Sequence, residues 1–178
     1  MPKILLHICC GPCASFPVPQ LREAGFDLMG YYYNPNIHPY TEWVKRKEAL
    51  QNYAAAVDLK VLYDEDYDPA QYFQAVSHRE ARRCFYCYQL RLEKAAQIAK
   101  KGKFDAFSTT LLVSRYQRHE WIKALGEAIG EKYEIPFLYR DFREGFQQTG
   151  VLAREMGLYR QQYCGCLYSE VERYRRKT

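Results

Sequence analysis

The sequence predicts an α/β protein of one domain, residues 1–178, built on a five-stranded parallel sheet with flanking helices. Short apolar or β-branched segments alternate with longer helical segments along the chain, as in strands joined by crossover helices. The 178 residues suffice for one hydrophobic core, and the sequence has no internal repeat, low-complexity segment or linker. The expected strands are 3–8, 26–33, 59–63, 104–109 and 135–139.

The first strand and the first helix meet at a cysteine-rich turn. The apolar run at 4–6 is typical of a buried strand, and Gly11 with Pro12 then forms a tight turn. A helix is expected over 15–24 and ends at Gly25.

The middle of the chain repeats this alternation. A loop rich in Asn and Pro, 34–39, precedes a helix over 40–57 that is rich in Lys, Glu and Ala. An acidic loop, 64–69, leads into a helix over 70–77. A strong apolar periodicity predicts a longer helix over 88–101.

Two further helices complete the pattern. The segment 117–129 reads as a helix, and 143–156 is a helical stretch that Gly145 and Gly150 interrupt. A tail rich in Tyr and Arg follows.

Composition restricts the class of function. The sequence has no secretory signal and no apolar stretch near the ~20 residues of a membrane helix, so we expect a soluble, cytoplasmic protein without a membrane partner. Seven cysteines in a reducing compartment favour metal ligands or redox catalysts over a disulfide framework. The net charge of +5 and 17 tyrosines fit a nucleic-acid surface, although tyrosines are also ordinary half-buried residues.

Polar or nucleophilic residues follow the carboxyl end of every expected strand, which is where open α/β sheets bind ligands. These residues are Cys9 and Cys10; Asn34 and Asn36; Asp64 and Asp66; Ser108, Thr109 and Thr110; and Asp141.

Several of the candidate residues have more than one explanation. His38 could ligate a metal or donate a hydrogen bond, or it could face solvent from its loop. Asp64 and Asp66 could supply a carboxylate ligand or a proton. The segment 108–110 could position a substrate or bind phosphate, or its threonines could reflect β-propensity alone.

The cysteines form three clusters. Three follow the first strand, and the others form the pairs Cys84/Cys87 and Cys164/Cys166. The run CGPC at 10–13 matches a thioredoxin active site, but the element order and the remaining thiols do not fit that fold. Four thiols would satisfy zinc, and a cysteine-rich set also suits an iron–sulfur cluster. Spacing alone does not choose between the two metals.

Basic residues outside this constellation are candidates for binding RNA phosphates, or they form a solvated basic face. They are Arg79, Arg82, Arg83, Arg115, Arg118 and His119, with Arg173, Arg175, Arg176 and Lys177 in the tail.

Taken together, these motifs resemble the QueH family, the cobalamin-independent epoxyqueuosine reductases. The matching runs are LHICCGPC at 6–13, YNPNIHP at 33–39, RCFYC at 83–87 with RL at 91–92, FSTTL at 107–111 and YRQQYCGC at 159–166. The resemblance implies an adenine-nucleotide-hydrolase-like fold with strand order 3-2-1-4-5. It also implies reduction of epoxyqueuosine to queuosine at the tRNA wobble position, the last step of queuosine biosynthesis, by an enzyme with a [4Fe-4S] cluster.

The resemblance further implies roles for individual residues. The implied cluster ligands are Cys9, Cys10, Cys84 and Cys87. Cys164 and Cys166 would be a redox-active pair or ligands of a second iron or other metal ion, and any of the seven thiols, including Cys13, could ligate a metal. Asp64 or Asp66 would supply protons, and the substrate contacts would come from Asn34, Asn36, His38, Ser108, Thr109, Thr110 and Arg115. The partners would be tRNAs with GUN anticodons and an electron donor of unknown identity.

Two competing interpretations remain. ATP-dependent tRNA thiolases of related fold need a Ser-Gly-Gly-x-Asp-Ser loop after the first strand, where this chain has CGPCAS at 10–15, which disfavours ATP pyrophosphatase chemistry. A zinc-stabilised tRNA-binding protein is the alternative without catalysis.

Overall fold

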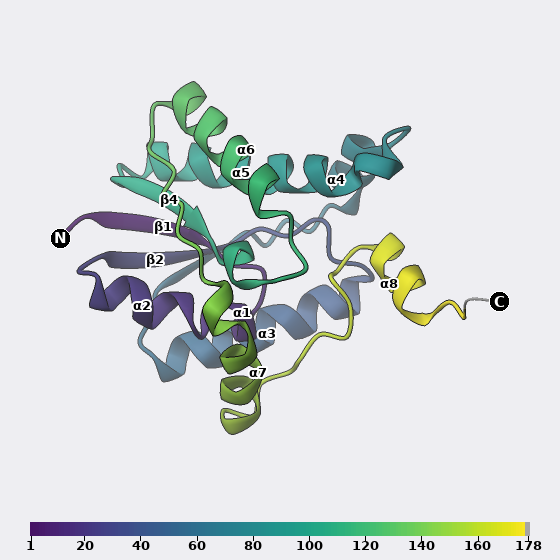
Figure 1. Ribbon diagram of the computed structural model, residues 1–178, viewed down its shortest axis with the longest axis horizontal. Helices are drawn as coiled ribbons and strands as arrows, with labels where there is room; N and C mark the ends of the chain where they lie inside the picture. Colours follow the sequence, from purple (N-terminus) through teal and green to yellow (C-terminus); the bar gives the residue numbers. More distant parts are fainter. Residues whose placement is uncertain (177–178) are drawn as a thin grey trace.

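The computed structural model describes residues 1–176, so the predicted phosphate contact at Lys177 lies outside the described residues. Four parallel strands form one sheet in the order β3-β2-β1-β4 (Figure 1). The strands are β1 (Lys3–His7), β2 (Asp27–Tyr32), β3 (Val61–Tyr63) and β4 (Ala106–Thr109). In the central register, Leu5 lies between Met29 of β2 and Phe107 of β4.

The prediction of a fifth strand is wrong. Within the described residues, segment 135–139 forms only an isolated parallel bridge between Phe107 and Phe137. The Pro136 carbonyl accepts a hydrogen bond from the Phe107 amide at 3.0 Å. Because proline has no N–H to donate, the ladder of hydrogen bonds cannot continue toward the N-terminal end of this segment. In the other direction, the carbonyl of Leu138 accepts from the Ser108 hydroxyl at 2.8 Å. The sheet order is therefore 3-2-1-4, and a single bridge stands where the fifth strand was expected.

Residues 1–176 contain eight α-helices, two more than the six that were predicted. The α-helices are α1 (Gly11–Ala14), α2 (Pro17–Glu23), α3 (Tyr40–Ala56), α4 (Pro69–Val76), α5 (Arg83–Lys101), α6 (His119–Tyr133), α7 (Phe146–Glu155) and α8 (Leu167–Tyr174). Short 3₁₀ turns are η1 (Glu80–Arg82), η2 (Thr110–Val113) and η3 (Arg143–Gly145).

Three differences affect the site. The predicted tight turn at Gly11 and Pro12 is helix α1, which begins directly after Cys10, and the helix predicted over 15–24 is α2. Helix α5 begins at Arg83, so its first turn contains the Cys84/Cys87 pair. The tail forms α8, whose N-cap is Cys166.

The sheet is covered on both faces. Figure 1 shows α5 and α6 on one side and α1, α2 and α3 on the other. Double coverage explains why β1 reads as a continuous apolar run, since a strand buried on both faces has no polar side. Leu5 and Leu6 have no exposed surface, and Phe107 beside them is equally buried. Among residues 1–176, no helix combines the length and apolar character that crossing a membrane requires.

Candidate functional site

A cavity of about 590 Å³ opens at the carboxyl ends of the strands. Segments far apart in the sequence contribute to its wall: the turn after β1, the loop after β2, helix α5, the loop after η2 and the segment before α8. Cys9, Cys13 and Cys164 line it, together with Asn36 and Arg91. The cavity therefore lies at the edge of the sheet where the sequence predicted a site.

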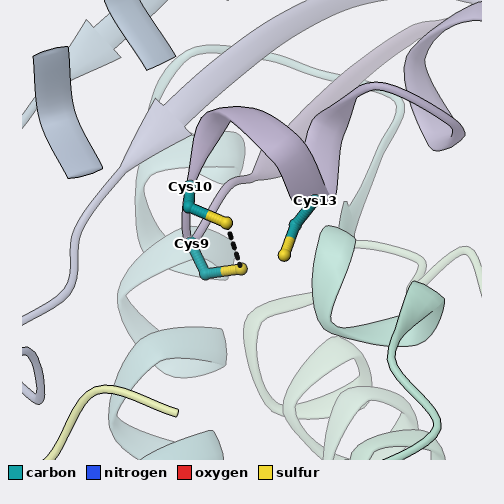
Figure 2. A group of neighbouring side chains, drawn as sticks. All are labelled: Cys9, Cys10 and Cys13. Carbon is teal, nitrogen blue, oxygen red and sulfur yellow. Dashed lines mark hydrogen bonds between the residues drawn. The ribbon is translucent and has the colours of Figure 1, made fainter. Parts of the chain in front are cut away.

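Cys9, Cys10 and Cys13 form a compact group of thiols at the start of α1. Their sulfur atoms all lie within 4.8 Å of one another, and Figure 2 shows the three side chains turned toward a common point. Gly11 makes this arrangement possible, because a Cβ at that position would lie 2.6 Å from the carbonyl oxygen of Ala49 in α3. A glycine is thus required for α1 to pack closely against α3.

Polar neighbours hold this thiol group. The Gln161 amide donates to the sulfurs of Cys10 at 3.2 Å and Cys13 at 3.6 Å. The Thr110 hydroxyl oxygen accepts from the Cys9 amide at 3.3 Å and lies 3.5 Å from the Cys9 sulfur. Hydrogen bonds from Cys10 and Cys13 lower the pKa of Cys9, whereas burial raises the pKa of Cys10. The group thus favours one thiolate, and soft thiolate sulfur is the ligand type that iron–sulfur clusters and zinc select.

Of the other four cysteines, Cys164 lines the cavity, and Cys87 and Cys166 are buried. Cys87 and Cys166 belong to one buried cluster, so the two pairs face each other. Burial raises the pKa of Cys87 to about 12 and is the first cause of the raised pKa of Cys84. Within residues 1–176, only Cys9, Cys10 and Cys13 form a group of three or more potential metal ligands this close together.

Arg91 joins the two groups of cysteines. Its guanidinium donates to the Cys87 sulfur at 3.3 Å, and although burial lowers its pKa, the nearby sulfurs of Cys87, Cys164 and Cys9 raise it. Four residues separate it from Cys87, so the two side chains share one face of α5. A buried cation at this place offsets the negative charge that thiolate ligands bring.

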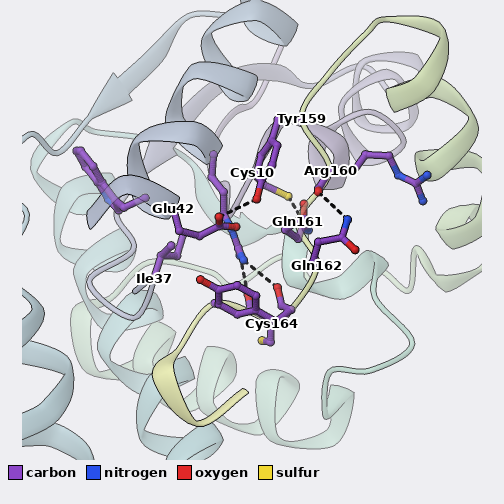
Figure 3. A network of polar contacts seen from close by, with 12 residues as sticks. Cys10, Ile37, Glu42, Tyr159, Arg160, Gln161, Gln162 and Cys164 are labelled. Atoms are coloured by element: carbon purple, nitrogen blue, oxygen red, sulfur yellow. Dashed lines mark hydrogen bonds and ion pairs between the residues drawn. The ribbon is translucent and has the colours of Figure 1, made fainter. Parts of the chain in front are cut away.

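A buried ion pair fixes the segment 159–166 against α3. Arg46 is 2% exposed and donates to the carbonyl oxygens of Cys164 at 2.6 Å and Tyr163 at 2.8 Å. It also pairs with Glu42 at 2.9 Å, and Glu42 accepts from the Tyr159 hydroxyl at 2.7 Å. Figure 3 shows this network with Gln161 and Cys164 beside it.

The loop after β2 contains two asparagines with different surroundings. Asn34 donates to the Ile8 carbonyl at 2.9 Å and contacts His7 at 3.2 Å, so it connects the ends of β1 and β2. Asn36 lines the cavity, is 2% exposed, and its side-chain oxygen has no hydrogen-bond partner in the described structure. His38 stacks on Phe73 and accepts from the Leu167 amide at 3.1 Å, which anchors the start of α8.

The remaining predicted residues divide between structural contacts and the cavity. Asp64 accepts from the Tyr31 hydroxyl at 3.1 Å and the Asp66 amide at 3.3 Å, and neither aspartate lines the cavity. The side chains of Ser108 and Thr109 contact Leu138 and His7. Thr110 does line the cavity, beside Cys9. Arg115 is exposed and does not line the cavity, but it lies over the ring of Phe146, which does.

Sequence reasoning assigned no role to several side chains in this site. Arg91 carried a usable signal, because it lies four residues after Cys87 in a helical segment. No pattern of spacing indicated Gln161 or Gln117, because both lie in irregular segments. The Gln117 side chain donates a hydrogen bond to the Cys164 sulfur at 3.4 Å. Arg46 lies in the helix predicted over 40–57, to which the sequence assigned no site residue.

A family model and individual known proteins match this chain under the same family description. Residues 4–172 match the family model described as epoxyqueuosine reductase QueH. The epoxyqueuosine reductase QueH of Dehalococcoides mccartyi is 36% identical over 173 residues, covering 97% of this chain and 95% of the relative. That of Thermotoga maritima is 37% identical over 182 residues, covering 97% of this chain and 93% of the relative.

Two solved structures share the fold at low sequence identity. The U34-tRNA thiolase NcsA from Methanococcus maripaludis, solved with its [4Fe-4S] cluster, has a TM-score of 0.62 and 16% identity, covering 96% of this chain and 63% of that one. A predicted subunit of tRNA methyltransferase from Methanocaldococcus jannaschii has a TM-score of 0.56 and 14% identity, covering 87% of this chain and 75% of that one. These likenesses confirm the expected α/β fold.

Proposed function

This chain belongs to the QueH family of epoxyqueuosine reductases and is an oxidoreductase of queuosine biosynthesis; from that premise we propose how its cysteine cavity acts on tRNA. The substrate is epoxyqueuosine at the wobble position of tRNAs with GUN anticodons, and the product is queuosine. The observation that supports this assignment best is the close group of Cys9, Cys10 and Cys13 beside a cavity at the sheet edge that Cys9, Cys13 and Cys164 line.

The thiols suit a [4Fe-4S] cluster. A cluster of this type takes four cysteine ligands, and the compact group at the start of α1 lies on only one side of the cavity. From the resemblance to the family we assign the ligands to Cys9 and Cys10 in that group and to Cys84 and Cys87 near the start of α5. Arg91, whose charge acts on both Cys9 and Cys87, would balance the charge of this ligand set.

The reaction consumes two electrons and two protons. Both C–O bonds of the epoxide break, an alkene forms, and the oxygen leaves as water. When bound, the cluster supplies single-electron transfer. Oxidation of the Cys164 and Cys166 thiols to a disulfide releases two electrons and two protons, which balances the reaction. An external donor then reduces the disulfide again.

Two features of the cavity suit a flipped nucleoside. Its volume of about 590 Å³ lies within the range of small-molecule sites. Asn36 offers a buried acceptor without a partner, and such a group costs free energy until a ligand donates to it. Asn36 would accept from an N–H group of the base, with Thr110 and Arg115 at the inner wall and rim. A wobble base must leave the anticodon stack to reach this position.

Two measurements test the function. Protein purified without oxygen should be brown, with about four irons per chain, and the Cys9→Ser and Cys84→Ser variants should lose that iron. A Cys13→Ser variant that loses the iron equally would overturn the ligand assignment.

The decisive assay incubates tRNA containing epoxyqueuosine with the reduced protein and identifies nucleosides by mass spectrometry. We expect the mass of one oxygen atom to be lost. A colourless zinc protein that leaves the nucleoside unchanged would refute the function and favour a zinc-stabilised tRNA-binding protein.

A further inference from the structure

Three arginines and three aromatic rings form a continuous row at the start of α5 and α6. We call it the arginine–aromatic row, and its members are Arg79, Tyr86, Phe85, Arg82, Trp121 and Arg118. Arg118 lies 4.4 Å from the centre of the Trp121 ring, and Arg82 lies 4.9 Å from that of Phe85. The Phe85 and Trp121 rings meet edge to face at 5.7 Å, which joins the two halves of the row.

The arginines of this row have their hydrogen-bonding groups free. Among residues 1–176, the guanidinium groups of Arg79, Arg82 and Arg118 form neither an ion pair nor a side-chain hydrogen bond. Glu80, between two of them in sequence, accepts from the His78 amide instead. Arg83, directly beside the row, pairs with Glu172.

Such arginines are suited to bind an anion. All three are exposed, so five N–H donors on each can reach a ligand. Contact with a ring restrains the long side chain beforehand, which reduces the entropy lost on binding. Like charges held together without a carboxylate repel each other, and a polyanion removes that repulsion.

The row lies next to the cysteine cavity. Arg82 lies two residues before Cys84, and Arg118 follows the cavity residue Gln117. Tyr88 links the two, because its hydroxyl donates to the Gln117 side chain at 2.6 Å and accepts from the Arg118 amide at 3.1 Å. Figure 1 shows α5 and α6, whose first turns carry the three rings of the row, side by side over one face of the sheet.

We propose that the arginine–aromatic row binds the sugar–phosphate backbone of the tRNA anticodon loop on the side of the flipped nucleotide. The inference rests on the proposed function, because a wobble base inside the cavity leaves its neighbouring phosphates at the rim. Guanidinium groups bind phosphates with paired hydrogen bonds, and aromatic rings stack on unpaired bases. Salt-dependent RNA binding is the expected consequence.

The test measures binding of a fluorescently labelled, unmodified anticodon stem-loop RNA to the anaerobically purified full-length protein over a range of salt concentrations. The perturbing variant is Arg82→Gln with Arg118→Gln. Its matched control is Lys60→Gln with Lys101→Gln, which removes the same charge from exposed side chains before β3 and at the end of α5. Neither lysine makes a side-chain hydrogen bond or an ion pair within the described residues.

Loss of two phosphate contacts should lower the slope of log K against log salt by about 1.4, because each contact in a single strand contributes about 0.7. The same relation gives about 25-fold weaker binding at about 0.1 M salt. The lysine control should bind like the wild type. If the double variant does not fold, Arg79→Gln alone should lower the slope by about 0.7.

Equal slopes and affinities for the wild type and the double variant would overturn the proposal. Unchanged RNA binding combined with lost turnover from a protein electron donor, but not from dithionite, would overturn it in favour of a docking surface for that donor. Failure of the proposed function looks different: the wild type would leave epoxyqueuosine intact and yet bind RNA through the row.

Discussion

Replacing Arg46 by methionine should destabilise the protein and release the segment that holds Cys164 and Cys166. Methionine retains much of the side-chain volume but removes every donor of the guanidinium. The substitution breaks the 2.9 Å ion pair with Glu42 and leaves that carboxylate buried, with the Tyr159 hydroxyl as its remaining partner. It also removes the donors to the Tyr163 and Cys164 carbonyl oxygens.

The expected loss follows from this geometry. Breaking a buried ion pair by removing one partner costs about 3–5 kcal/mol. The two carbonyl oxygens would each lose a charged hydrogen bond worth about 1.5–3 kcal/mol if the segment stayed in place. The segment can instead move into water, where these oxygens are hydrated. We therefore expect a fall of about 3–5 kcal/mol in the free energy of unfolding, with segment 159–166 detached.

Urea denaturation measures the first effect, and the rate of alkylation of Cys164 and Cys166 measures the second. Adding Glu42→Gln to the Arg46→Met variant should recover part of the stability, because the buried carboxylate is then neutral. The exposed Arg154→Met is the matched control and should have little effect. A loss below about 1 kcal/mol with unchanged alkylation would show that this ion pair does not hold the segment.

Three further predictions follow from the described contacts. Gly11→Ala should lower the free energy of unfolding by about 1–3 kcal/mol in thermal denaturation, because its Cβ would approach the backbone of Ala49. The control Gly150→Ala should lower it less, because its Cβ would meet only the flexible end of an arginine side chain. Gln161→Leu should make the cluster's reduction potential more negative in a redox titration, because sulfur loses an amide donor; an unchanged potential would contradict this role. Burial, then the charge of Arg143, lowers the pKa of His119 below its usual 6.5. The stability that neutral His119 contributes is therefore present above pH 6.5 and is lost as the pH falls below it. In urea denaturation, the free energy of unfolding of His119→Gln should fall less between pH 7 and pH 5 than that of the wild type. An equal fall would refute this cause.

Local patterns in the sequence determined the fold class and the place of the site. The apolar run at 4–6 predicted a strand buried on both faces, and β1 is that strand. Alternation of strands and helices predicted a parallel sheet, and parallel strands bring their carboxyl ends to one edge whatever the details of the loops. The cysteines after the first strand were thus predicted to lie at that edge from spacing alone.

The tertiary structure decided which side chains act together at the site. Segment 135–139 has the composition of a strand, but the missing N–H of Pro136 and the Ser108 hydroxyl limit it to one bridge. The Gln161 contact with Cys10 joins residues 151 positions apart, and the Arg46 contact with Cys164 joins residues 118 apart. Periodicity reports only neighbours within a few residues, because it arises from the repeat of a single helix or strand. Contacts across more than 100 residues depend on how the packed elements bring the chain together, so the folded structure alone placed the irregular segment before α8 over the cysteines of the first strand.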